Sequence, residues 1–129
     1  MNGKFLLDTN IIIALFRKDI AAQSEILEDE NTYIPDIVIG ELYYGAFKSS
    51  RSIENVSLID TFVDKINILG LNPGIAKEYG NIKNTLRRKG RPIPDNDIWI
   101  AAIAKHYTLT LVTRDEHFKE VEELSLESW

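Results

Sequence analysis

Short apolar runs and longer stretches with helical spacing alternate along the chain. The short runs predict strands at residues 5–7, 32–34, 66–71 and 109–112, with a weaker candidate at 125–126. The helical spacing predicts helices at residues 11–16, 21–28, 37–48, 52–64, 73–89 and 95–104. This alternation favours an α/β fold, in which a mainly parallel sheet of about five short strands is flanked by helices on both faces.

Several predicted elements carry local end signals. Asp36 is a candidate N-cap for the helix that follows it, and the Asn-Pro pair at 72–73 is a typical helix start. Gly90 predicts the end of that second helix. The last helix begins at residue 95 or 96 and is apolar nearly all round, so we expect it to be buried. No repeat or linker divides the sequence, which predicts a single domain over residues 1–129.

Composition limits the chemistry that the chain can perform. It has 15 Lys and Arg against 20 Asp and Glu, a net charge of −5, which argues against nucleic-acid binding through a general positive field. Cysteine is absent, and His106 and His117 lack the spacing of a zinc site. A metal site must therefore use carboxylates, which favour Mg²⁺ or Mn²⁺. The sequence shows neither a leader peptide nor an apolar run of about 20 residues, so we expect a cytoplasmic protein.

Four acidic residues are candidates for one shared site. Asp8 and Asp115 each follow a predicted strand, and acids at the carboxyl ends of neighbouring parallel strands point at one crevice. Glu41 falls on the predicted inward face of its helix, and Asp97 lies in the first turn of the buried helix. Two carboxylates about 4 Å apart repel by about 4 kcal/mol at an effective dielectric near 20. A convergent set would therefore bind one or two divalent cations, which suits phosphodiester hydrolysis.

Each acid also has a purely structural interpretation. Asp8 and Asp115 are of a type that forms turns or caps the next helix. Glu41 has an ion pair with Lys4 or Arg114 as its alternative, because a buried carboxylate needs a partner. Asp97 would be a favourable charge at a helix N-terminus, although the neighbouring Asp95 fits that capping role better.

Other reaction classes lack their motifs in this sequence. It has no GxSxG elbow, no SxxK pair, no GxxxxGK[ST] loop and no GxGxxG turn. A phosphoacceptor receiver domain needs an acidic pair after the first strand and a late lysine, and the residues Asp8-Thr9 and Thr113-Arg114 stand there instead. A haloacid-type phosphatase needs a second Asp where Asn10 stands.

Four segments of the chain resemble the PIN domain family, and more narrowly its VapC-type toxins. They are LDTN at 7–10, IGELYYG at 39–45, PDNDIWIAA at 94–102 and LVTRDEHF at 111–118. They occur in the family's order and spread over nearly the whole chain. The resemblance implies a three-layer α/β/α fold and a metal-dependent endoribonuclease that works with Mg²⁺ or Mn²⁺.

The resemblance also implies roles for individual residues. Asp8 and Asp97 would be direct metal ligands, while Glu41 and Asp115 would bind a metal directly or through water and orient the attacking water. Thr9, Asn10 and Thr113 would support the site by hydrogen bonds. His117 occupies a position that is often acidic in the family and receives no role. Members of this size are commonly homodimers, and a cognate VapB-type antitoxin wraps the toxin and blocks the acids.

Two further surfaces bear on partners. Five basic residues fall within nine positions of the chain, shortly before Asp97: Lys83, Arg87, Arg88, Lys89 and Arg91. They would either bind the phosphates of RNA or form a solvated helix end that complements the helix dipole. Aromatic residues Tyr43, Tyr44 and Phe47 share a helix with Glu41 and would suit an antitoxin helix or a dimer partner. Two alternative functions stay open, a non-catalytic interaction module and a housekeeping nuclease without an antitoxin.

Overall fold

A computed structural model describes residues 3–17 and 23–129 of the chain. Its centre is one five-stranded sheet with the order β3-β2-β1-β4-β5, in which every neighbouring pair is parallel. The strands are β1 (Phe5–Leu7), β2 (Thr32–Pro35), β3 (Asn67–Leu69), β4 (Thr110–Val112) and β5 (Leu126–Glu127). All five strand predictions are confirmed in position; β1 has the predicted ends, and the ends of the other four differ.

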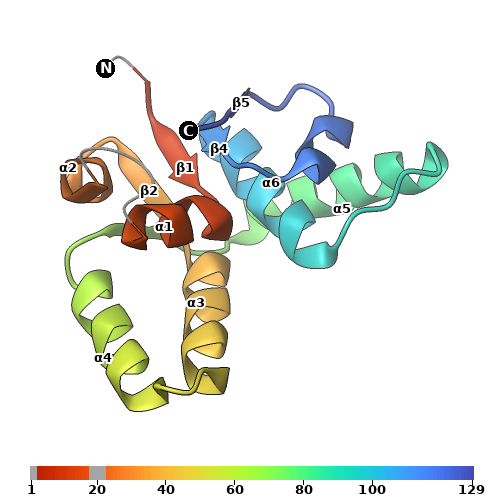
Figure 1. The fold of residues 1–129 in the computed structure, drawn as a ribbon. Coiled ribbons are helices and arrows are strands. Elements are labelled where there is room, and N and C mark those ends of the chain that lie inside the picture. Colours follow the sequence, from red (N-terminus) through yellow and green to blue (C-terminus); the bar gives the residue numbers. More distant parts are fainter. Residues whose placement is uncertain (1–2, 18–22) are drawn as a thin grey trace.

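Helices cover the sheet on both sides, which confirms the predicted three-layer α/β/α fold (Figure 1). In the described part they are α1 (Thr9–Phe16), α2 (Gln23–Glu28), α3 (Asp36–Lys48), α4 (Ser52–Val63), α5 (Pro73–Arg88) and α6 (Asp95–Tyr107), with the short 3-10 helix η1 (Glu116–Glu120). The helices α3 and α4 pack as one pair, and α5 and α6 as another. The start of the predicted helix at 21–28 lies outside the described residues, since α2 is described only from Gln23.

Strand lengths follow from the available pairing partners. The edge strand β3 was predicted at 66–71 but ends at Leu69, because its partner β2 ends at Pro35 and offers no further backbone groups. The strand predicted at 109–112 begins at Thr110. Leu109 instead donates its N–H to Ala104 O at 2.8 Å, and together with the left-handed Thr108 this bond closes the end of α6.

The predicted cap at Asp36 is wrong. Pro35 extends β2 by pairing with Leu69 and is itself the N-cap, so Asp36 becomes the first helical residue and makes no cap hydrogen bond. The Asn-Pro helix start is confirmed, because the Asn72 side chain accepts the Ile75 N–H at 2.9 Å. Gly90 has a φ of +68°, the left-handed backbone predicted at this end.

The core is built from the strands together with the apolar faces of the helices, and α6 contributes a long buried run to it. The middle strands β1 and β4 are buried along their length except at Thr110, and Ile100 to Ala104 of α6 are fully buried, as predicted from their apolar character. The buried residues of α3 are Val38, Leu42 and Ala46, and Glu41, predicted on the inward face, is half-buried. Among the described helices, none is long and apolar enough to span a membrane.

Candidate active site

The order of the strands places the carboxyl ends of β1 and β4 side by side, which is the place of the predicted crevice. These strands are direct neighbours, with Leu7 beside Val112, and the chain leaves them towards opposite halves of the sheet. Ligands of doubly wound sheets bind at such a switch point. Asp8 follows β1, and its N–H continues the ladder by donating to Val112 O at 3.0 Å. The strands before Asp8 and Asp115 are therefore neighbours, as the predicted convergence of the two acids requires.

Asp8 is both a helix cap and a buried acid. Its Oδ1 accepts the Thr9 N–H at 2.8 Å as the N-cap of α1, and its Oδ2 accepts the Thr113 hydroxyl at 2.8 Å. The residue is only 5% exposed. Burial raises the pKa of the Asp8 carboxyl, and these two hydrogen bonds oppose the increase without cancelling it. The structural role thus fixes the side chain in the crevice.

Glu41 reaches the same crevice from α3. Its Oε1 accepts the Thr9 hydroxyl at 3.1 Å, which links the first turn of α1 to α3. Burial, followed by the negative charge of Asp8, raises the pKa of Glu41 above its ordinary value. The alternative ion pair is not found among the described residues: Arg114 donates its Nε to Trp129 O at 3.0 Å, and Lys4 is exposed without a pairing to Glu41.

Asp97 is the most perturbed acid of the group. It lies in the first turn of α6 with its side chain 15% exposed. Burial, then the charges of Asp8 and Asp115, raise its pKa from 3.8 to about 6. Asp95, expected to cap this helix, does not: Pro94 is the N-cap, and the Asp95 carboxylate instead binds Tyr79 and Lys83, each at 3.0 Å. These bonds lower the pKa of Asp95.

Asp115 caps η1 and carries a neighbour that the sequence reasoning missed. Its Oδ1 accepts the His117 N–H at 2.9 Å, and the His117 Nδ1 lies 3.2 Å from the same oxygen. The same ring nitrogen lies 3.4 Å from Asp97 Oδ2. An Asp followed two residues later by a polar residue is a signal for this backbone turn. Nothing in the spacing reveals that the imidazole turns back towards Asp97.

The small polar residues connect the two loops of the crevice. Thr113 Oγ1 donates to Asp8 and accepts the Asp115 N–H at 3.0 Å, so one hydroxyl fixes two of the acids. Asn10 Oδ1 accepts the Arg114 N–H at 3.2 Å and ties the loop after β1 to the loop after β4. The three polar residues expected to support the site, Thr9, Asn10 and Thr113, all contact it.

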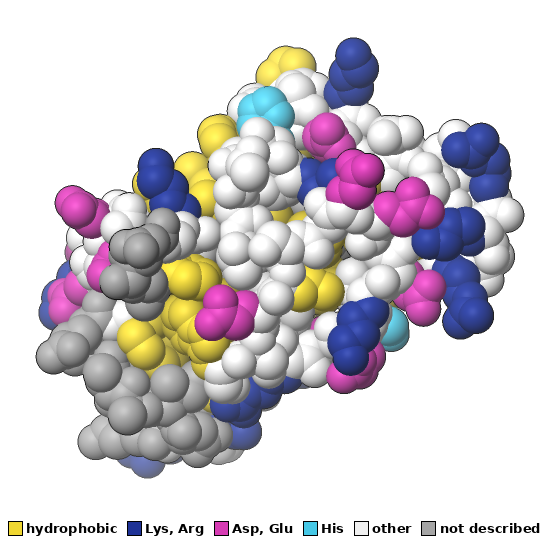
Figure 2. All heavy atoms as spheres, turned by 90° about the horizontal axis from the view of Figure 1, so that it is seen from above, with side chains coloured by type: hydrophobic (Ala, Val, Ile, Leu, Met, Phe, Trp, Pro, Cys, Tyr) yellow, Lys and Arg dark blue, Asp and Glu magenta, His cyan; other side chains and the backbone are white. Residues whose placement is uncertain are grey.

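The five predicted RNA-binding cations are not equivalent. Three of them form ion pairs, Lys83 with Asp95, Lys89 with Glu122 and Arg91 with Glu120. Arg87 and Arg88 are exposed and form no ion pair within the described part of the chain. Figure 2 shows cations interleaved with acids at the end of the molecule where α5 ends. A surface of purely positive charge is therefore absent from the described residues there.

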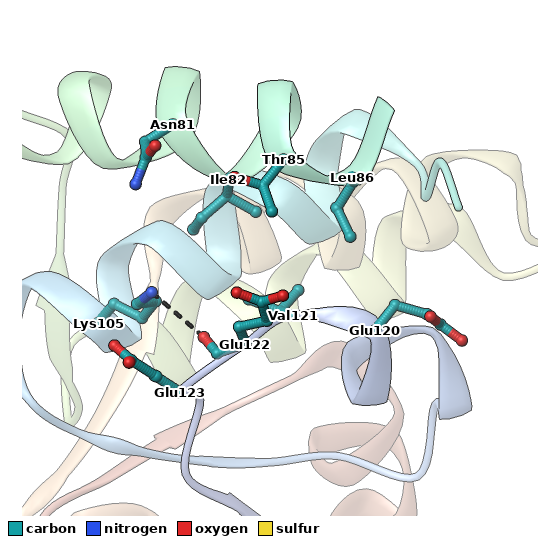
Figure 3. Close-up of a pocket in the computed structure, with 9 residues that line it drawn as sticks. All are labelled: Asn81, Ile82, Thr85, Leu86, Lys105, Glu120, Val121, Glu122 and Glu123. Atoms are coloured by element: carbon teal, nitrogen blue, oxygen red, sulfur yellow. Dashed lines mark hydrogen bonds between the residues drawn. The ribbon is translucent and has the colours of Figure 1, made fainter. Parts of the chain in front are cut away.

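A separate pocket between α5, α6 and the segment after η1 holds none of the four acids (Figure 3). Lys105 of α6 donates to Glu122 O at 3.2 Å across this pocket. Lys89 at the end of α5 donates to Glu120 O at 3.1 Å. These bonds hold the C-terminal segment against the helix pair, and they thereby place η1 beside the start of α6.

The acid cluster has the donors that a divalent metal requires. One ligand atom each from Asp97, Asp115 and His117 lie within 4.8 Å of one another, so these residues could hold a metal ion. Asp8 and Glu41 stand in the same electrostatic field, because the charge of Asp8 raises the pKa of both Glu41 and Asp97. A cation that binds between such carboxylates offsets their negative charges and removes their mutual repulsion.

Comparison with known proteins gives the same family throughout the chain. The PIN domain model matches residues 5–124. Ribonuclease VapC1 of Haemophilus influenzae is 35% identical, over 97% of each chain, and the tRNA(fMet)-specific endonuclease VapC of Shigella flexneri is 35% identical, over 98% of each. Among solved structures, VapBC2 of Rickettsia felis bound to a DNA fragment from its promoter is similar, with a TM-score of 0.86. The sequences are 33% identical, and the match covers 97% of this chain and 98% of the other. The chain therefore belongs to the PIN domain family and, within it, to the VapC ribonucleases.

Proposed function

We propose that this protein is an Mg²⁺- or Mn²⁺-dependent endoribonuclease and the toxin of a VapBC-type toxin–antitoxin pair. The observation that carries the proposal is the convergence of Asp8, Asp97 and Asp115 at the carboxyl ends of β1 and β4, where burial, followed by the charges of Asp8 and Asp115, raises the pKa of Asp97 to about 6. Such a cluster is unfavourable in isolation and becomes favourable around a divalent cation. Membership of the VapC ribonucleases supports RNA as the substrate.

In this proposal the four acids divide the work. Asp8 and Asp97 would hold the metal directly, and Glu41 and Asp115 would hold it directly or through water. When bound, the metal lowers the pKa of water and stabilises negative charge on phosphate oxygens. Glu41, held by Thr9, is placed to orient the attacking water and accept its proton. Thr113 and Asn10 keep the loops after β1 and β4 at a fixed separation.

A cognate antitoxin is the proposed protein partner. A groove between α1, α3 and α4 is lined by Thr9 and Glu41 at one side and by the apolar Phe16 and Leu58 at the other. Tyr44 and Phe47 on α3 are 67% and 66% exposed. An apolar segment lying in this groove would reach Glu41 and obstruct the acids.

We also propose that the toxin is a homodimer in the cytoplasm and that residues 1–129 form one PIN domain.

The acid site leads to a prediction about cleavage. Replacing Asp97→Asn keeps the side-chain shape but removes a metal ligand, so RNA cleavage should fall by about 100-fold or more, the scale typical for loss of one electrostatic group in an active site. Initiator tRNA is the first substrate to test, because the Shigella flexneri relative is named for it.

The matched control for this experiment is Asp95→Asn. Asp95 lies in the same helical turn, but its carboxylate binds Tyr79 and Lys83 outside the crevice. This variant should keep cleavage near the wild-type rate. A folded Asp97→Asn protein that cleaves as fast as the wild type would contradict the metal mechanism, and a wild-type protein inert towards all RNAs would favour the non-catalytic module.

The raised pKa of Asp97 leads to a prediction about stability. Folding raises this pKa from 3.8 to about 6, so between these values the folded metal-free protein holds more protons than the unfolded chain. The contribution of Asp97 to stability is therefore lost as the pH rises from about 4 to about 6. Thermal unfolding should show that Mn²⁺ raises the Tm more at pH 7.5 than at pH 5, because protons and metal compete for the carboxylates.

Asp97→Asn serves as the internal check of this stability experiment. Without metal at pH 7.5 it should unfold at a higher temperature than the wild type, because one of the repelling charges is gone. It should also show little stabilisation by Mn²⁺. An equal Mn²⁺ effect at both pH values would show that these acids do not hold the ion.

Arg87 and Arg88 at the end of α5 form no ion pair with the other described residues, and this leads to a prediction about RNA binding. We propose that Arg87 and Arg88 contact phosphates, whereas Lys83, Lys89 and Arg91 are held by acids. Arg87 lines a hollow with Ile98, the residue after Asp97. The double variant Arg87→Ser, Arg88→Ser should raise KM with little change in kcat and lower the salt dependence of RNA binding by about one phosphate contact per arginine.

An arginine away from the site provides the control for this variant. Arg51 is exposed and pairs with Glu54 at the start of α4. Arg51→Ser should leave KM and the salt dependence unchanged. An unaltered salt dependence in the double variant would assign Arg87 and Arg88 to a solvated helix end instead.

A further inference from the structure

His117 combines an exposed surface position with close contacts to two candidate ligands. Its side chain is 54% exposed, yet its Nδ1 lies 3.2 Å from Asp115 Oδ1 and 3.4 Å from Asp97 Oδ2. The ligand atoms of the three residues all lie within 4.8 Å of one another. A mostly exposed imidazole contributes little to the core, so packing does not explain why it turns towards the acids.

The backbone around His117 fixes the ring in this place. Asp115 Oδ1 accepts the His117 N–H at 2.9 Å, which sets the first turn of η1. The next residue, Phe118, is fully buried and anchors that turn in the core. The bond from Lys105 to Glu122 O holds the following segment against α6 (Figure 3). The imidazole is therefore presented from a rigid turn, as a metal ligand requires.

We infer that His117 is a nitrogen ligand of the metal bound by the acid cluster, which converts an all-oxygen site into a mixed nitrogen and oxygen site. This inference rests on the proposed metal-dependent function and adds a residue and a metal preference to it. The sequence position of His117 predicts no role for it. The three candidate donors Asp97, Asp115 and His117 come from the start of α6 and from the turn into η1.

A nitrogen ligand changes which metal the site prefers. Mg²⁺ is a hard cation that takes oxygen ligands and keeps much of its water, so it gains little from an imidazole. Imidazole suits the later first-row ions, and affinity for a nitrogen-containing site rises from Mn²⁺ to Co²⁺ and Ni²⁺. His117 should therefore make the site select Mn²⁺ or Co²⁺ over Mg²⁺.

A second role for His117 would give the same contacts. As a protonated imidazolium it would act as a counter-ion that donates hydrogen bonds to Asp97 and Asp115 and competes with a metal for them. The two roles predict opposite effects of removing the ring. Loss of a ligand weakens Mn²⁺ binding, whereas loss of a competing cation strengthens it or leaves it unchanged.

Pulsed EPR of the Mn²⁺-loaded protein at pH 7.5 tests the ligand directly. A coordinated imidazole gives a ¹⁴N coupling, and the chain has only two histidines, so the source of any coupling is limited to His106 and His117. The coupling should be present in the wild type, lost in His117→Ala and retained in His106→Ala. His106 is the matched control because it lies in the last turn of α6, at the opposite end from Asp97.

Calorimetric titration with Mn²⁺ and Mg²⁺ provides the second measurement. His117→Ala should weaken Mn²⁺ binding by about tenfold or more and Mg²⁺ binding by less, since losing even an indirect partner of a metal costs about 10- to 100-fold. His117→Asp restores an oxygen donor, so it should recover Mg²⁺ binding while the preference for Mn²⁺ stays reduced.

The outcomes separate this inference from the proposed function. Mn²⁺ that binds without a ¹⁴N coupling, or binds more tightly to His117→Ala, overturns the ligand role of His117 and leaves the metal-dependent nuclease intact. A wild-type protein that binds neither ion in the titration overturns the proposed function and this inference together. A coupling that survives in His117→Ala and disappears in His106→Ala overturns the inference alone.

Discussion

Repulsion among carboxylates at the carboxyl ends of β1 and β4 is the constraint on which the rest of the site depends. Asp8 is nearly buried, and burial of Asp97, followed by the charges of Asp8 and Asp115, raises the pKa of Asp97 to about 6. A protein that only needed to fold would gain by replacing one of these acids with an apolar or amide side chain. The divalent cation that we propose would offset this repulsion.

The fold keeps the acids together through interactions that do not themselves need a metal. The parallel pairing of β1 with β4 brings the two loops side by side, and Thr113 joins them by bonding to Asp8 and Asp115. Asp8 is further fixed as the cap of α1. Backbone N–H groups hold Asp8 and Asp115, and the Thr9 hydroxyl holds Glu41, so these three side chains are restrained from moving apart to relieve repulsion.

Much of this arrangement follows from sequence pattern, because the period of apolar residues reports burial directly. The strands, the buried α6 and the placement of Asp8 and Asp115 after β1 and β4 were predictable for this reason. The cap at Asp36 was not, since the length of β2 depends on its pairing with β3. The role of Asp95 was likewise not predictable, because its carboxylate binds Tyr79 and Lys83 from another helix. The direction of the His117 ring depends on a turn anchored by Phe118, and no local spacing encodes it.

Some of the cations near the end of α5 that were predicted to bind RNA stabilise the fold through ion pairs. Lys89 and Arg91 pair with acids of the C-terminal segment and so help to hold η1 near α6.

The most direct test of the proposed metal site is anomalous diffraction from crystals of the protein grown with Mn²⁺ at pH 7.5. We predict one or two manganese peaks in contact with Asp8 and Asp97. Manganese bound only elsewhere, with these carboxylates still together and no ion between them, would contradict it.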